Sequence, residues 1–257
     1  MKSVKKTFIV VGNWKMNPDS ILEAKALCSR ISRLIKNIDK VEVVVAPPAP
    51  FLSDLAGKAG GIITTSAQDV SAEERGSFTG SISAREVQST GAEYTILGHS
   101  ERRASGDTDA LVADKLKRAL EAGLKIVLCV GEKERDEHAH YLRFVREQLV
   151  TSLAGLSSKE IKSIRIAYEP VWDIGKSYDK ALKPNDIHEM ALYIKKVASE
   201  ILGKKDGLKI PVLYGGSVNF ENAQDILKEG GVDGLLVGRQ SLDPEAFSNI
   251  IHYANNL

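Results

Sequence analysis

The stretch from residue 125 to residue 169 reads KIVLCVGEKERDEHAHYLRFVREQLVTSLAGLSSKEIKSIRIAYE and predicts the fold. Two short apolar runs, at 125–131 and 163–169, flank an amphipathic stretch of helical length at 135–153. Apolar runs that do not alternate with polar residues are typical of parallel strands buried on both faces. The stretch therefore predicts a strand, a helix and a second parallel strand, joined by a right-handed crossover.

The same strand-and-helix unit repeats in both directions along the chain. The predicted strands are residues 7–12, 41–46, 61–67, 92–98, 125–131, 163–169, 209–215 and 234–238. The helical stretches are residues 20–38, 108–123, 135–153, 184–203, 219–231 and 243–254. Such a pattern fits an open doubly wound sheet or a closed barrel. Eight regular units without a linker favour the barrel, so we predict an α/β fold, a (β/α)8 TIM barrel, as a single domain over residues 1–257.

The composition is that of an ordinary globular protein, with 43% hydrophobic and 27% charged residues. Because 35 Lys and Arg residues nearly balance 34 Asp and Glu residues, we expect no nucleic-acid or membrane partner. The apolar run FIVV (8–11) is shorter than the about 7–15 residues of a signal-peptide core, so we expect no processing. Cys28 and Cys129 are too few for a disulfide framework or a metal cluster. These features indicate a cytoplasmic protein without a bound metal.

Polar and glycine residues follow the ends of several predicted strands. They are Asn13, Lys15, His99, Glu169, Ser217 and Gly238. In a (β/α)8 barrel the loops after the strands gather on one rim and form the active site. A carboxylate such as Glu169 can remove a proton beside a carbonyl, although a lone glutamate at a strand end more often pairs with a surface lysine. His99 precedes a predicted helix start at Ser100, where the helix dipole disfavours an imidazolium.

Seven segments closely resemble those of triosephosphate isomerases, in the family's order and at about its spacing. They are GNWKMN (12–17), AQDVSAEERGSFTG (67–80), LGHSERR (97–103), CVGE (129–132), AYEPVW (167–172), YGGSV (214–218) and LLVG (235–238). The resemblance implies an enzyme without a cofactor that acts in glycolysis and gluconeogenesis. Its small-molecule substrates would be dihydroxyacetone phosphate and D-glyceraldehyde 3-phosphate, interconverted through an enediol(ate).

The resemblance also implies a role for individual residues. Glu169 would be the base, His99 would polarise the carbonyl, and Lys15 would supply positive charge. Asn13 would be a hydrogen-bond partner of Lys15, and Glu101 would be its ionic partner. The substrate phosphate would bind the backbone at Gly175, Ser217, Gly238 and Arg239. Thr79 would project into the neighbouring subunit of a homodimer.

Two places depart from the family pattern. The segment after the sixth predicted strand reads VWDIGKSYDKALKP (171–184) and resembles the family's mobile lid, but Asp173, Ser177, Tyr178 and Asp179 are atypical. Gly238 is followed by Arg239, where many relatives carry a second glycine, and a positive φ there would strain an arginine.

The unusual lid keeps one alternative open, which is a non-catalytic or altered-specificity phosphate-binding barrel paralogue. An aldolase of the imine type is disfavoured, because the predicted strand cores are nearly free of lysine.

Overall fold

Eight parallel strands close into a barrel in the computed structural model, which describes residues 8–57, 61–136, 138–176 and 181–257. The strands follow one another around the barrel in chain order, and β1 pairs with β8 to close it. Their bounds are β1 (Phe8–Asn13), β2 (Val41–Ala46), β3 (Ile63–Ala67), β4 (Tyr94–Leu97), β5 (Lys125–Val130), β6 (Ile164–Tyr168), β7 (Val212–Tyr214) and β8 (Gly234–Val237). The predicted (β/α)8 barrel is confirmed, and the open sheet is excluded.

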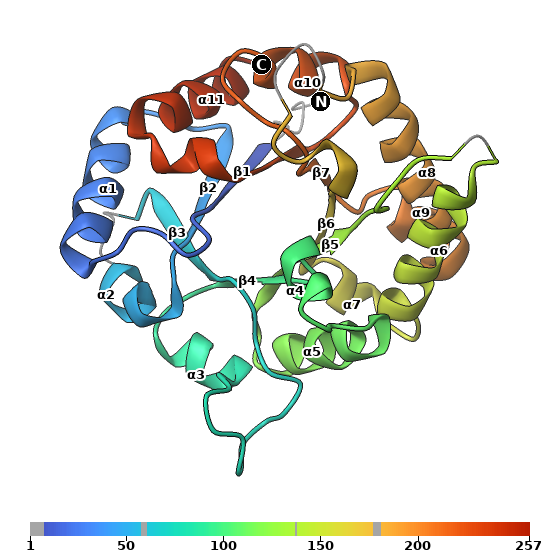
Figure 1. The fold of residues 1–257 in the computed structure, drawn as a ribbon, viewed down its shortest axis with the longest axis horizontal. Coiled ribbons are helices and arrows are strands. Elements are labelled where there is room, and N and C mark those ends of the chain that lie inside the picture. The colour runs from blue at the N-terminus through green and yellow to red at the C-terminus, as the bar shows by residue number, and fades with distance from the viewer. Residues whose placement is uncertain (1–7, 58–60, 137, 177–180) are drawn as a thin grey trace, which may run out of the picture.

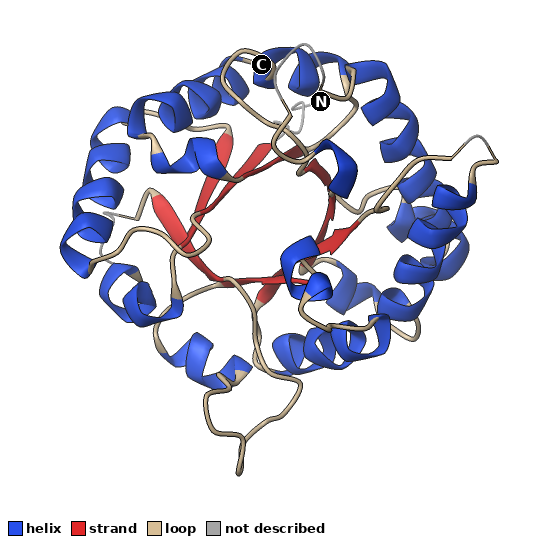
Figure 2. Cartoon of the chain, in the orientation of Figure 1, coloured by secondary structure: helices blue, strands red, loops and turns tan. Residues whose placement is uncertain are grey.

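Most of the helices surround the barrel as an outer layer, whereas α4 lies over the edge of the strand ring in this view (Figures 1 and 2). They are α1 (Ile21–Leu34), α2 (Leu52–Leu55), α3 (Ala84–Ser89), α4 (Ser100–Ala104), α5 (Asp109–Glu121), α6 (His140–Leu153), α7 (Ser158–Ile161), α8 (Pro184–Leu202), α9 (Lys204–Gly207), α10 (Ala223–Glu229) and α11 (Pro244–Asn256). Within the described ranges, none of these helices combines the length and apolarity needed to cross a membrane.

Several predicted elements are shorter in the structure, and for two of them individual residues explain the difference. The helix predicted at 135–153 begins only at His140, because the Asp136 carboxylate accepts hydrogen bonds from the backbone N–H groups of His138 (2.8 Å) and His140 (3.1 Å). This bonding favours a turn over a helix start. The strand predicted at 209–215 is reduced to Val212–Tyr214. Pro211 has no N–H with which to extend the ladder.

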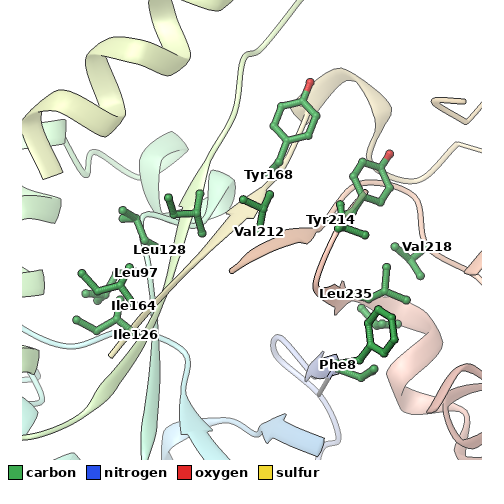
Figure 3. Close-up of a cluster of buried hydrophobic side chains, with 14 of the residues drawn as sticks. Phe8, Leu97, Ile126, Leu128, Ile164, Tyr168, Val212, Tyr214, Val218 and Leu235 are labelled. Carbon is green, nitrogen blue, oxygen red and sulfur yellow. The ribbon is translucent and has the colours of Figure 1, made fainter. Parts of the chain in front are cut away.

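Alternation along the strands divides the apolar core into two parts. Side chains of one parity fill the barrel interior: Ile9, Val11, Val44, Ala46, Tyr94, Ile96, Val127, Cys129, Ala167, Leu213 and Leu236. Side chains of the other parity pack against the helices, and Figure 3 shows Leu128, Ile164 and Val212 of this buried cluster. Both faces of every strand are thus covered, which explains the apolar runs of the sequence.

The same alternation places polar groups at the two ends of the interior. Val11 points into the barrel, so Asn13, two residues later at the end of β1, does so as well. Glu169 follows the inward Ala167 of β6 in the same way. At the opposite end, the Tyr94 hydroxyl donates to Oε1 of Glu42 at 2.7 Å. Function is therefore expected at the end that carries Asn13 and Glu169.

Candidate active site

Glu169 and His99 are buried side chains in direct contact. His99 caps α4, where its Nδ1 accepts a hydrogen bond from the backbone N–H of Glu101 at 3.2 Å. An accepting Nδ1 carries no proton, so the ring proton of the neutral imidazole belongs to Nε2. That Nε2 lies 3.2 Å from Oε1 of Glu169, and the N–H of Ser100 donates to the other carboxylate oxygen at 3.2 Å. A neutral proton donor and a carboxylate are thus positioned side by side.

The chain around Glu169 fits together closely. The backbone N–H of Glu169 donates to the carbonyl of Val130 at 2.8 Å. A Cβ at Gly131 would lie only 1.9 Å from the Glu169 carbonyl oxygen, so this approach requires glycine. Beneath the carboxylate, burial and then the charge of Glu169 raise the pKa of the Cys129 thiol. Cys129 therefore stays protonated and acts as a small apolar group.

Lys15 is held in a left-handed backbone conformation, with φ of 53°. Such a conformation costs a non-glycine residue on the order of 1–3 kcal/mol and must be stabilised by its surroundings. Asn13 contributes by accepting the Lys15 N–H on Oδ1 at 3.0 Å, and Gln68 donates from Nε2 to the Lys15 carbonyl at 2.7 Å. The Lys15 ammonium donates to Oε1 of Glu101 at 2.6 Å. The ammonium is thereby directed to the mouth of the barrel.

A cavity of about 390 Å³ joins these groups with the glycine-rich turns after β6, β7 and β8. All of the predicted catalytic and phosphate-binding residues line it: Asn13, Lys15, His99, Glu101, Glu169, Gly175, Ser217, Gly238 and Arg239. A Cβ at Gly238 would lie 3.7 Å from Cε of Lys15, so these two residues are neighbours. The structure thus gathers the Lys15 ammonium, the His99 imidazole, the Glu169 carboxylate and several backbone turns around a single space.

Arg239 occupies its position without the strain considered above. It begins the 3₁₀-helix η4 (Arg239–Leu242), and positive φ among the non-glycine residues of the described ranges is confined to Lys15, Asn37 and Ala139. The first N–H groups of a helical turn are free to bind an anion.

Asp173 lies in the 3₁₀-helix η2 (Val171–Asp173) and is fully buried. Its Oδ2 accepts hydrogen bonds from the Tyr214 hydroxyl (2.5 Å) and the Ser217 N–H (3.2 Å). Its Oδ1 accepts from the Leu182 N–H at 2.9 Å. Asp173 is atypical for the family, but the sequence contained no signal that its carboxylate would bind Tyr214 at the end of β7 and Ser217 in the following turn. The other atypical lid residues, 177–179, lie outside the described residues.

Thr79 lies apart from the cavity. It belongs to the loop between β3 and α3, which projects from the barrel (Figure 1), and it is exposed. The same loop exposes Phe78 and Ile82 by 46% and 39%. Over the described part of the chain, no group of three or more His, Cys, Asp and Glu side chains is arranged to hold a metal ion.

Comparison with known proteins agrees with this geometry over nearly the whole chain. The triosephosphate isomerase family model matches residues 8–254. The triosephosphate isomerase of Thermus thermophilus is 41% identical over 252 residues, covering 96% of this chain and 98% of that protein. Those of Coprinopsis cinerea and Aquifex aeolicus are 40% and 37% identical over 251 and 248 residues, covering 96% and 95% of this chain and 98% of each relative. The chain therefore belongs to the triosephosphate isomerase family.

Proposed function

We propose that the cavity at the mouth of the barrel interconverts dihydroxyacetone phosphate and D-glyceraldehyde 3-phosphate, with Glu169 as the base. Membership of the triosephosphate isomerase family assigns the reaction to the chain. One observation supports the assignment of the residues most strongly. Glu169, His99 and Lys15 all line one cavity of about 390 Å³, although Lys15 and Glu169 lie 154 positions apart in the sequence.

Proton transfer in this proposal uses the two groups that are in contact. Glu169 removes a proton from the carbon beside the carbonyl and returns it to the adjacent carbon. His99 gives its Nε2 proton to the former carbonyl oxygen and takes the proton of the neighbouring hydroxyl, so the carbonyl and the hydroxyl change places. This role suits its neutral tautomer, in which Nδ1 accepts from the Glu101 N–H. Lys15 adds positive charge near the developing anion. The reaction moves one carbon-bound proton and one hydroxyl proton within the substrate and needs no oxidant or reductant.

The phosphate end of the substrate is assigned to backbone N–H groups. Gly175, Ser217, Gly238 and Arg239 line the cavity in the loops after β6, β7 and β8, and Gly238 lies beside Lys15. A phosphate dianion bound there gains charge-assisted hydrogen bonds without a dedicated side chain. Binding at this end would orient the carbonyl end toward His99 and Glu169.

The steady-state rate of glyceraldehyde 3-phosphate conversion tests the proposal. Glu169→Gln keeps the size of the side chain but removes the base, and turnover should fall by at least about 10²–10⁴-fold. Glu42→Gln is the matched control, because Glu42 accepts a tyrosine hydroxyl at the far end of the barrel and should leave turnover unchanged. A well-folded wild-type chain without turnover would instead favour the non-catalytic or altered-specificity paralogue.

The proposal includes a homodimer in the cytoplasm. Phe78 and Ile82 are large apolar side chains exposed on the projecting loop that carries Thr79. A second subunit would cover them and bring Thr79 toward a neighbouring cavity, and a twofold dimer is the commonest symmetric assembly. Cys28 and Cys129 are both free thiols, which agrees with a reducing compartment.

A further inference from the structure

The backbone N–H of Ser217 already has an anionic partner within the chain. It donates to Oδ2 of Asp173 at 3.2 Å, and the Ser217 hydroxyl donates to the carbonyl of the same residue at 2.7 Å. This N–H is also one of the amides assigned above to the substrate phosphate. We propose that the Asp173 carboxylate is an internal competitor of the substrate phosphate, which must displace it from Ser217 in order to bind. The inference rests on the proposed phosphate site.

The contact between Asp173 and Ser217 belongs to a well-formed buried site. The Asp173 side chain has 0% exposure, and both of its carboxylate oxygens accept hydrogen bonds. Room for the carboxylate depends on Gly216. A Cβ there would lie 2.2 Å from the Tyr214 hydroxyl oxygen and 2.8 Å from Oδ2 of Asp173. The absence of a side chain at Gly216 therefore leaves the space that the Asp173 carboxylate occupies at the turn after β7.

Electrostatics makes the two anions mutually exclusive at this amide. One N–H cannot donate a full hydrogen bond to both a carboxylate and a phosphate oxygen. Two negative charges close together also repel each other strongly away from bulk water. Phosphate must therefore replace the carboxylate at Ser217 in order to bind this amide. Asp173 thus lowers the affinity for phosphate relative to an uncharged residue at the same position.

Displacement of Asp173 would also affect a second hydrogen bond. Asp173 ends η2, and the following residues Ile174, Gly175 and Lys176 line the cavity. The other oxygen of the same carboxylate accepts the backbone N–H of Leu182 at 2.9 Å. A phosphate that removes the carboxylate from Ser217 therefore also perturbs its hydrogen bond with Leu182.

Titration with inorganic phosphate tests the proposal in the wild-type chain. The amide resonances of Ser217 and Leu182 should shift with the same midpoint, because both N–H groups donate to the carboxylate that is displaced. The Asp173→Asn variant should bind phosphate about tenfold more tightly as a competitive inhibitor, since the charged competitor is gone. Asp173→Ala should change affinity in the same direction. Glu42→Gln, which removes the charge of another carboxylate that accepts a tyrosine hydroxyl, should bind phosphate like the wild type.

The outcomes separate this inference from the function on which it rests. A Ser217 resonance that shifts while Leu182 does not would overturn the competition, since the carboxylate would have stayed in place. Equal or weaker phosphate affinity in folded Asp173→Asn and Asp173→Ala would overturn it as well. Competitive inhibition without any shift at Ser217 would overturn the proposed phosphate site itself, and with it the basis of the competition.

Discussion

The Nε2 atom of His99 and the Oε1 atom of Glu169 lie 3.2 Å apart, although the two residues follow strands that are not neighbours. His99 follows β4 and Glu169 follows β6, and β5 lies between these strands in the barrel. A substrate that accepts a hydrogen bond from one group and gives a proton to the other must have its reacting carbons between the two strand ends. The contact thus marks where the chemistry takes place.

Replacement of His99 by glutamine should lower kcat much more than it changes KM. The amide can still fill the space, but it cannot exchange a proton with the enediolate, so turnover is expected to fall by about 10²–10⁴-fold. Steady-state kinetics with glyceraldehyde 3-phosphate measures both parameters. His140→Gln is the control, because the His140 side chain is 76% exposed at the start of α6. A large rise in KM with unchanged kcat would show that His99 only binds substrate.

Replacement of Phe78 by aspartate should convert the predicted dimer into monomers. Phe78 is 46% exposed on the projecting loop, and a charge there would be buried unpaired by a second subunit. Sedimentation velocity at micromolar concentration should give the mass of two chains for the wild type and of one chain for the variant. Phe220→Asp is a matched control, since Phe220 is 45% exposed but follows β7. A fully active wild-type monomer would rule out the dimer.

The free energy of unfolding should depend on the Cys28 thiol in alkaline solution. Burial raises its pKa from 9.0 to about 11. The thiol is protonated in both states below pH 9, and between pH 9 and 11 it ionises only in the unfolded chain. Stability is therefore lost as pH rises through this window, by up to about 2–3 kcal/mol.

Urea unfolding at about pH 8 and about pH 10.5 measures this loss. Cys28→Ala removes the ionising group, so the wild type should lose more stability than the variant as pH rises. Subtraction of the two curves cancels the other groups that ionise over the same range. Parallel curves for the two chains would contradict the effect.

The eight strands could be predicted because they are buried on both faces, which makes most of them nearly continuous in apolar residues. Their exact ends depended on individual hydrogen bonds that no pattern of apolar residues records. Asp136 stabilises a turn where the pattern continued a helix, and Pro211 removes a donor where it continued a strand. The closed sheet was predicted from the number of repeated strand-and-helix units. In the structure β8 pairs with β1, so neither strand is left as an open edge.

The predicted site residues converge because each follows a strand and parallel strands end on the same rim. Their catalytic and binding roles stay predictions. The sequence did not reveal the supporting contacts, which join loops that follow different strands. Gln68 supports the backbone of Lys15 from the end of β3, and Asp173 reaches the turn after β7. Gln68 lies in a segment that resembles the family, and Asp173 lies in the atypical lid segment. The sequence therefore drew attention to both residues, but their hydrogen-bond partners are known only from the fold.

Pairing of the first strand with the last has a consequence for how the chain is made. Lys15 follows β1 and Gly238 follows β8, yet a Cβ at Gly238 would lie 3.7 Å from Cε of Lys15. During synthesis the lysine leaves the ribosome long before its neighbour is translated. A nascent chain that ends before β8 lacks one side of the cavity, however well its earlier strands have paired. Appearance of enzymatic activity therefore reports the moment at which the last strand closes the barrel.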